Sequence, residues 1–378
     1  EERGVWLAPG DLAAMGADPG AESPPAGRLS WGEREIAQLP QRTAEGWASF
    51  FFAPDRSTRT SGRTAIRLDF GSPGSSMVRE EAEAAGSTSP VAGMATLRWE
   101  EDEHYVPQAE METPWLWEPL RTPSRGGVTH TVVLPDALSG PVTVTLHVWS
   151  HTASAANPDH RLRLMWDGQV VDAWEWDGQG MQHLTTSFPG SAVEEHSLAL
   201  VTPEVPGAEV ALVWLDGYEV TYQRRVVADG CVWQAQGGSL EIDEAGAGAR
   251  VVDVTDPFAA RDLGMVAAGT RVDVTPGHRY WVGVPADARP PAAVRAVRSL
   301  DVDALQGVAY LAVAPRPFHG PVEALLEHRR RQGLSAAVVD PQAVYDTLGV
   351  GQPDAEVMRR LVERIPSLDY LLIVGDAT

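Results

Sequence analysis

The most constraining feature of this sequence is a change in the period of its hydrophobic pattern near residue 300. Between about residues 125 and 297, apolar and polar residues alternate, as in the run from Val142 to Val148. A period of two is typical of half-buried β-strands. After residue 300, apolar residues instead recur at helical spacing between short apolar runs. The chain therefore combines β-rich parts with an α/β unit.

The middle part of the chain consists of strand-like segments separated by glycine and proline turns. Asp167-Gly168 joins two of these segments and is a strong hairpin signal. This spacing of strands predicts a β-sandwich or jelly roll. A further β-rich piece runs from Val226 to Val284, and the segment from Pro285 to Pro291 suits a linker. The predicted strands are Thr129 to Leu134, Val142 to Trp149, Arg161 to Trp166, Ser197 to Val201 and Glu209 to Tyr222.

The length of 378 residues allows two or three domains, at roughly 100–200 residues per domain. Residues 1–122 are irregular, with short apolar runs between stretches rich in proline, glycine and serine. Ala65 to Phe70 alternates and predicts a strand, and Asp11 to Met15 suits a short helical turn. We predict a β-rich domain over residues 1–122, a sandwich region over 123–297 and an α/β unit over 298–378.

The last part of the chain predicts three buried strands and two helices in alternation. Arg329 to Arg331 suit the end of the first helix, and Gly333 fits just beyond it. The order βαβαβ implies a parallel sheet with right-handed crossovers. Such a unit is too short to finish a sheet, and we expect a larger α/β domain to continue beyond it. The predicted strands are Tyr310 to Ala314, Leu334 to Val339 and Tyr370 to Val374. The apolar face of the first helix contains Val322, Leu325 and Leu326. The second helix has Pro353 in its first turn and Val357, Leu361 and Ile365 on its apolar face.

Charge and composition exclude several classes of function. The chain has 30 basic and 52 acidic residues, a net charge of −22, and every basic residue is arginine. A surplus of anions argues against binding nucleic acid or anionic lipid. The absence of lysine excludes a Schiff base or a phosphate-loop lysine. No run of about 18 apolar residues occurs, so we expect no membrane span.

Candidate site residues follow the predicted parallel strands, because ligands bind at the carboxyl edge of such sheets. Arg316 and His319 follow the first strand, Asp340 the second and Asp376 the third. A histidine and two aspartates at one edge suit acid–base chemistry on a substrate. The alternative is that they are ordinary polar loop residues, and no nucleophile accompanies them.

The single cysteine, Cys231, excludes an internal disulfide and lies in a β-rich stretch, where a lone cysteine is usually a small buried hydrophobe.

His147 and His151, with His160 nearby, suggest a metal site, although a structural role is the simpler interpretation. Trp166, Trp174 and Trp176 belong either to the sandwich core or to a sugar-stacking surface.

Three aspartates are candidate ligands for a structural Ca²⁺ ion. Asp102 lies in the acidic run from Glu100 to Glu103, and Asp253 and Asp256 frame a short turn-like segment. Carboxylates are preferred calcium ligands. The alternatives are a solvated charge run and ordinary turn residues.

The last 70 residues resemble gingipain-type cysteine peptidases. The resemblance rests on Tyr310 to Pro315 with Phe318, on Arg331 to Leu334, on Val338 to Asp340 with Val344 to Asp346, and on the ending Tyr370 to Thr378. Looser similarity extends upstream, to Leu12–Gly16, Leu29–Glu35, Glu100–Tyr105, Trp166–Gly168, Glu219–Arg224 and Asp253–Pro257.

This resemblance implies a caspase-like catalytic domain that hydrolyses peptide bonds through a Cys/His pair. The pair follows the glycine–aspartate turn and therefore lies outside this chain, so no catalytic residue is assigned here. The resemblance further implies a secreted or cell-surface protein, a protein or peptide substrate, structural calcium, and a carboxyl-terminal half that is present as a continuation or as a second processed chain. The alternatives are a carbohydrate- or surface-binding β-module without enzymatic activity and an inhibitory pro-segment.

Overall fold

The structure, a computed structural model, describes residues 3–18, 20–54, 64–80, 93–109, 114–124 and 126–375. The chain divides into two compact units. One consists of Glu1–Val78, Asp256–Ala260 and Pro285–Thr378, and the other of Arg79–Thr255 and Arg261–Val284. The chain passes between the two units at four places, and the first of these falls within β7 (Val78–Arg79). The division into three domains at residues 122 and 297 stays a prediction.

The second unit is a β-sandwich, as the sequence predicted. Its two sheets enclose one hydrophobic core, to which Val144, Leu146 and Leu164 contribute fully buried side chains. The larger sheet has the order β16 (Gly180–Gly190), β13 (Ala137–Ser150), β18 (Ala211–Arg224), β8 (Gly93–Glu100), β19 (Asp229–Gln234), β24 (Arg279–Gly283), β21 (Arg250–Asp253), β22 (Arg261–Met265) and β7 (Val78–Arg79), with β11 (Glu118–Thr122) paired to β18. The smaller sheet has the order β12 (Gly127–Val133), β17 (Glu195–Val201), β14 (His160–Trp166) and β15 (Gln169–Trp176).

Two short strand pairs complete this unit. They are β9 (His104–Tyr105) with β10 (Trp115–Leu116), and β20 (Ser239–Glu241) with β23 (Arg271–Asp273).

The alternation in β13 decides which of its side chains enter the core. Val144 and Leu146 are fully buried, whereas Thr145 and His147 lie on the opposite face of the sheet. The predicted hairpin is also confirmed, because Asp167-Gly168 connects β14 to β15. Both turn residues have positive φ, 49° for Asp167 and 78° for Gly168, as a type I′ turn requires.

The amino-terminal part of the first unit is built from two small antiparallel sheets and one helix. Phe51, Val5 and Ile36 pack with Leu12 of the helix in one apolar cluster. The strand order of one sheet is β1 (Arg3–Leu7), β5 (Gly46–Ala53), β4 (Gln38–Thr43). The order of the other is β3 (Arg34–Ile36), β2 (Arg28–Trp31), β6 (Arg67–Asp69). The helix is α1 (Pro9–Ala14).

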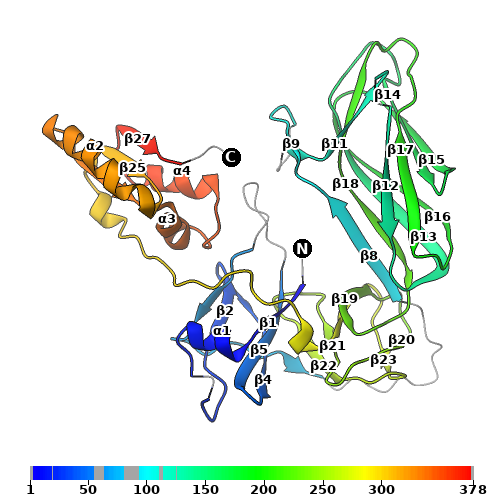
Figure 1. Ribbon diagram of the computed structural model, residues 1–378, viewed down its shortest axis with the longest axis horizontal. Coiled ribbons are helices and arrows are strands. Elements are labelled where there is room, and N and C mark those ends of the chain that lie inside the picture. Colours follow the sequence, from blue (N-terminus) through cyan, green and yellow to red (C-terminus); the bar gives the residue numbers. More distant parts are fainter. Residues whose placement is uncertain are drawn as a thin grey trace. The chain divides into compact units, whose positions relative to one another are not determined.

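The carboxyl-terminal part of this unit is the predicted parallel sheet, with helices on both faces (Figure 1). Its strand order is β26 (Ala336–Val339), β25 (Tyr310–Val313) and β27 (Tyr370–Ile373), and both strand pairs are parallel. Leu311 and Val313 pack toward α3 (Pro341–Leu348) and α4 (Ala355–Glu363). Ala312 packs on the other face, with Val322 and Leu326 of α2 (His319–Arg331).

The end of α2 follows the predicted pattern. Gly333 has a φ of 90°, and the amide of Leu334 donates to the carbonyl of Arg329, as in a Schellman motif. Two details of the helix prediction are wrong. The sequence pattern missed α3, which is only eight residues long. Pro353 does not lie in the first turn of α4, because Asp354 caps that helix and accepts a hydrogen bond from the amide of Glu356.

None of the helices that the structure describes is both long enough and apolar enough to cross a membrane.

Candidate functional site

The carboxyl edge of the parallel sheet is the candidate site, and His319 fixes its geometry after β25. The chain leaves the sheet at Ala314 and Pro315, forms the 3₁₀ turn η3 (Arg316–Phe318), and enters α2 at His319. Nε2 of His319 lies 2.8 Å from the carbonyl oxygen of Ala314. Because a carbonyl only accepts, Nε2 of His319 carries the proton and donates it. His319 thus ties the strand end to the helix start.

Asp340 lies at the same edge, after β26, and is buried among arginines. One of its carboxylate oxygens accepts a hydrogen bond from the amide of Gln342, which caps α3. The other oxygen pairs with Arg298 and with Nε of Arg316, the latter at 3.1 Å. Both oxygens are occupied and the residue is only 7 % exposed, so Asp340 organises the edge rather than presenting a free carboxylate.

Asp346 is a second buried carboxylate near this edge, and it was not among the predicted site residues. Arg295 binds it through two hydrogen bonds of 2.7 Å each, and the amide of Arg298 and the side chain of Gln342 add two more. Burial alone would raise the pKa of Asp346, but these hydrogen bonds and the charge of Arg295 hold it below its usual value. The carboxylate therefore anchors the segment around residues 295–298 onto α3.

The edge as described contains a histidine, two buried carboxylates and three arginines, but no thiol. Asp376, the third predicted site residue, lies outside the described residues. Arg316 is the most exposed of the charged side chains named here, with 64 % of its side chain accessible. In the described part of the edge, the chemistry available is recognition of anionic or carbonyl oxygens rather than nucleophilic attack.

Strand β27 forms the border of the sheet and is unusually exposed for a strand of a parallel sheet. Within the described residues it pairs only with β25. On the face that α3 and α4 cover elsewhere, Leu371 is 42 % and Ile373 70 % exposed. Parallel strands are normally covered on both faces. The border of this sheet therefore presents both unpaired backbone groups and bare apolar side chains.

Cys231 lies in β19 of the sandwich, and its surroundings keep the thiol protonated. Burial, with a contribution from the charge of Asp229, raises the pKa of Cys231 to about 11. Nη1 of Arg224 lies 2.7 Å from its sulfur and opposes the shift without reversing it. At neutral pH only about one thiol in ten thousand is ionised, which is the opposite of an activated nucleophile.

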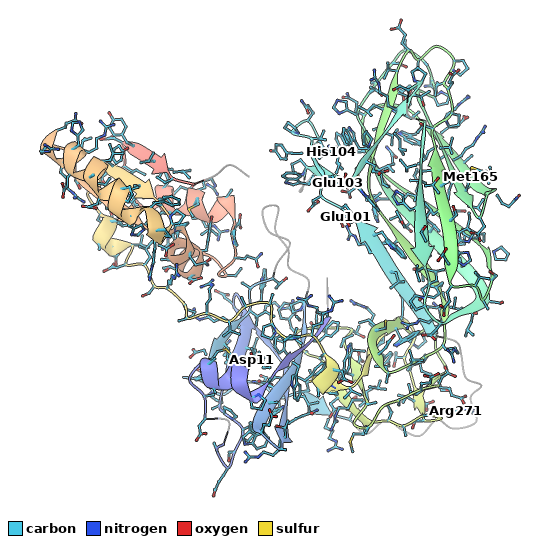
Figure 2. The ribbon with its side chains drawn as sticks, viewed as in Figure 1. Asp11, Glu101, Glu103, His104, Met165 and Arg271 are labelled. Carbon is cyan, nitrogen blue, oxygen red and sulfur yellow. The ribbon has the colours of Figure 1, made fainter. Side chains whose placement is uncertain are left out.

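The three candidate calcium ligands have different surroundings. Asp253 accepts hydrogen bonds from Thr255 and lies 2.9 Å from Nδ1 of His278. Asp256 caps the amide of Phe258 and pairs with Arg34. Asp102 is exposed, and its neighbours Glu101 and Glu103 lie with it on the segment that leads into β9 (Figure 2). In the part of the chain that the structure describes, no three His, Cys, Asp or Glu side chains are grouped to hold a metal ion.

The predicted cluster of three histidines does not form. His160 is fully buried between Asp159, 2.6 Å from its Nδ1, and Thr152, 3.1 Å from its Nε2. His147 instead lies on the outer face of β13, against His183 of β16.

The tryptophans belong to the core of the sandwich. Trp166 is 6 % exposed, and Trp174 and Trp176 pack against the same hydrophobic cluster. Trp176 also stacks on His160 with ring centroids 5.5 Å apart. The core interpretation therefore holds for these residues, and they do not form a free sugar-stacking surface.

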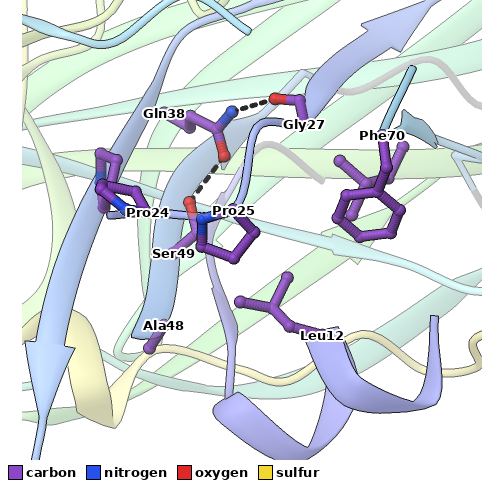
Figure 3. Close-up of a pocket in the computed structure, with 10 residues that line it drawn as sticks. Leu12, Pro24, Pro25, Gly27, Gln38, Ala48, Ser49 and Phe70 are labelled. Atoms are coloured by element: carbon purple, nitrogen blue, oxygen red, sulfur yellow. Dashed lines mark hydrogen bonds between the residues drawn. The ribbon is translucent and has the colours of Figure 1, made fainter. Parts of the chain in front are cut away.

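A small cavity lies in the amino-terminal part of the first unit, between α1 and the sheet that contains β4 and β5 (Figure 3). Its polar wall is Gln38, which donates to the carbonyl of Gly27 and accepts from the hydroxyl of Ser49 at 2.8 Å. Its volume is about 10 Å³, room for roughly one water molecule. It is too small for a substrate.

Comparison with known proteins connects the carboxyl-terminal unit to a family. Residues 303–378 match the family model of peptidase family C25, the gingipain family. The resemblance seen in the sequence is thereby confirmed for this part of the chain. No curated protein matches the sequence.

Among solved structures, the chain is similar to dimeric latent PorU from Porphyromonas gingivalis. The two share 16 % sequence identity with a TM-score of 0.65, over 96 % of this chain and 38 % of PorU. A family 35 carbohydrate binding module from Clostridium thermocellum matches 35 % of this chain and 97 % of the module at 12 % identity, but the TM-score of 0.21 is too low to carry an argument. The similarity to PorU is one of fold: a mainly β, multidomain chain with a small parallel sheet and helices at its carboxyl-terminal end.

Proposed function

We propose that this chain is the amino-terminal portion of a gingipain-like cysteine endopeptidase, whose catalytic Cys/His pair lies outside residues 1–378. The main observation behind the proposal is that residues 303–378 match the C25 family model. These residues include a parallel sheet whose border strand, β27, has exposed apolar side chains. The chain spans 38 % of PorU, so the activity of the whole protein is inferred and not seen in this chain.

The exposed strand β27 supports the proposal because it needs a partner. Leu371 and Ile373 are the side chains that a further strand and helix of an α/β domain would bury. In the proposed protein, the rest of the catalytic domain pairs with the free edge of β27. It arrives either as a continuation of the chain or as a second, processed chain.

The hydrogen bonds at the described edge favour a structural role for these residues rather than a catalytic one. His319 uses Nε2 within the fold, and Asp340 uses both of its carboxylate oxygens there. Cys231 is protonated and belongs to the other unit. We therefore propose that the chain alone is inactive, and that a peptide or protein is the substrate of the whole enzyme.

Secretion and structural calcium are further parts of the proposal. Secretion follows from the resemblance to gingipain-type peptidases, and the net charge of −22 favours solubility. Of the candidate ligands, only the exposed Asp102 and its acidic neighbours are not committed to a turn or an ion pair. A rise in the unfolding temperature on adding Ca²⁺, lost in Asp102→Asn, is the result that this part of the proposal predicts.

The decisive experiment compares the chain of 378 residues with its full-length parent in a peptide-hydrolysis assay. The parent should cleave fluorogenic peptides and lose activity on treatment with iodoacetamide, whereas the chain alone should be inactive. The matched control is Cys231→Ala, which should leave the parent's activity unchanged. Activity that resides in the isolated chain, or that Cys231→Ala abolishes, would contradict the proposal.

A further inference from the structure

The outer face of the larger sandwich sheet carries two histidines that the sequence does not bring together. His147 of β13 and His183 of β16 are directly opposite each other in the antiparallel register, 36 residues apart in the chain. Their Nδ1 atoms are 2.7 Å apart and their rings meet edge to face. The flanking pairs on this face, Thr145 with Thr185 and Thr143 with Ser187, are hydroxyl pairs. His183 is exposed, whereas the side chain of His147 is 18 % exposed.

A carboxylate lies on the far side of the His147 ring. Oε1 of Glu219, in β18, is 3.8 Å from Nε2 of His147. This distance is too long for a hydrogen bond, and Nε2 of His147 is a buried atom without a hydrogen-bond partner among the described residues. The two Nδ1 atoms face each other at hydrogen-bond distance, so one of them donates a single proton and the other accepts it.

We propose that His147 and His183 form a binding site for a divalent transition-metal ion, held between their Nδ1 atoms and oriented by Glu219. The metal replaces the single proton that the two nitrogens share. A carboxylate that accepts a hydrogen bond from the other nitrogen of a metal-bound histidine fixes its tautomer and raises its basicity. Glu219, 3.8 Å from Nε2 of His147, is the carboxylate that would move into this position when the metal binds.

The geometry needs only a small adjustment. Two nitrogens that bind one tetrahedral zinc ion at about 2.05 Å stand about 3.3 Å apart. The present separation of 2.7 Å must therefore open by about 0.6 Å, which rotation of two side chains at the surface of a sheet allows. Water supplies the remaining positions, because no third protein ligand is grouped with the pair among the described residues. The site is therefore an exchangeable one, selective for Zn²⁺, Cu²⁺ and Ni²⁺ over Ca²⁺ and Mg²⁺.

The test is a titration of the metal-free chain with Zn²⁺ by calorimetry, and with Cu²⁺ by electron paramagnetic resonance. Wild type should bind one equivalent of either ion, and the Cu²⁺ spectrum should show coupling to two nitrogens. His183→Ala should weaken binding at least tenfold and remove the coupling to one nitrogen. Glu219→Gln should weaken binding about tenfold, as loss of an orienting carboxylate does elsewhere.

The matched control is His151→Ala, which removes a neighbouring histidine outside the pair and should leave binding unchanged. Circular dichroism and unfolding temperature of the metal-free variants should equal those of wild type, since both histidines lie on the outer face. Equal affinity in wild type and in the double variant His147→Ala/His183→Ala would overturn the proposal, and so would loss of binding in His151→Ala alone.

Discussion

At the scale of single residues, Asp216 is a buried carboxylate in unfavourable surroundings. It lies at an irregularity of β18, is 7 % exposed, and has Glu100, Arg98 and Asp102 as charged neighbours. Burial, reinforced by the two carboxylates and opposed by Arg98, raises its pKa from 3.8 to about 6. Ionised Asp216 therefore destabilises the sandwich at neutral pH.

The sign of the pH dependence follows from this shift. Because the pKa of Asp216 is higher in the folded state, the unfolded chain releases its proton first as the pH rises. The contribution to stability is complete below about pH 4 and is lost as the pH rises through 6. A shift of this size corresponds to up to ~3 kcal/mol.

We therefore predict that Asp216→Asn stabilises the sandwich unit at pH 7.5 by up to ~3 kcal/mol and has little effect at pH 4. Urea unfolding of both proteins at the two pH values measures the difference. Asp273→Asn, an exposed aspartate of the same unit, is the control and should be neutral at both. A variant that gains nothing at pH 7.5 would show that Asp216 is not strained by its charge.

At the scale of elements, the turn between β14 and β15 offers a clean test of backbone conformation. A Cβ atom added at Gly168 meets no heavy atom within 4 Å, so its φ of 78° is the whole constraint. Gly168→Ala should destabilise the sandwich by about 1–2 kcal/mol. Gly320 in α2 has equally open space but no positive φ, and Gly320→Ala should stabilise its unit by about 0.5–1 kcal/mol. Thermal unfolding of the two variants checks both signs, and two changes of the same sign would refute the argument.

Strand β27 yields a second prediction at this scale. In the isolated chain, Ile373→Ser should change the free energy of unfolding by less than about 0.5 kcal/mol, since the side chain is 70 % exposed. In the full-length parent, where we propose that the strand is covered, the same change should cost more than about 2 kcal/mol. Leu311→Ala, at a fully buried position of the central strand, should cost about 2–5 kcal/mol in both. Equal, negligible effects of Ile373→Ser in both proteins would contradict a covered edge.

What the sequence predicted well is what depends on neighbouring residues. The alternation of β13, the Asp167-Gly168 turn and the Gly333 cap are local, and each lies where the pattern placed it. The short helix α3 was missed because eight residues, with only Ala343 and Val344 buried, give too little periodicity.

The arrangement of the sites depended instead on contacts between distant residues. A period of two tells which face of a strand His147 occupies, but not that β16 brings His183 opposite it. The pairing of Asp340 with Arg298 joins residues 42 apart and needs the folded edge. For the same reason, the sequence left open whether His319 and Asp340 are site groups or ordinary polar loop residues, and the structure adds that both bond within the fold.

At the scale of the whole molecule, the proposed metal site and the peptidase-like segment lie in different units. The sandwich holds the chain's one cysteine, in a form unsuited to attack, and the proposed metal site. The other unit holds the C25-like segment, with the exposed border strand β27. We propose that this chain contributes part of a catalytic domain without its nucleophile.

The most direct measurement of that claim is to treat the full-length parent with a thiol-reactive peptidyl probe and to locate the label by mass spectrometry. The account predicts one labelled cysteine outside residues 1–378, no label on Cys231, and no labelling when the isolated chain is treated alone. Specific labelling of Cys231, blocked by a competing peptide substrate, would contradict it.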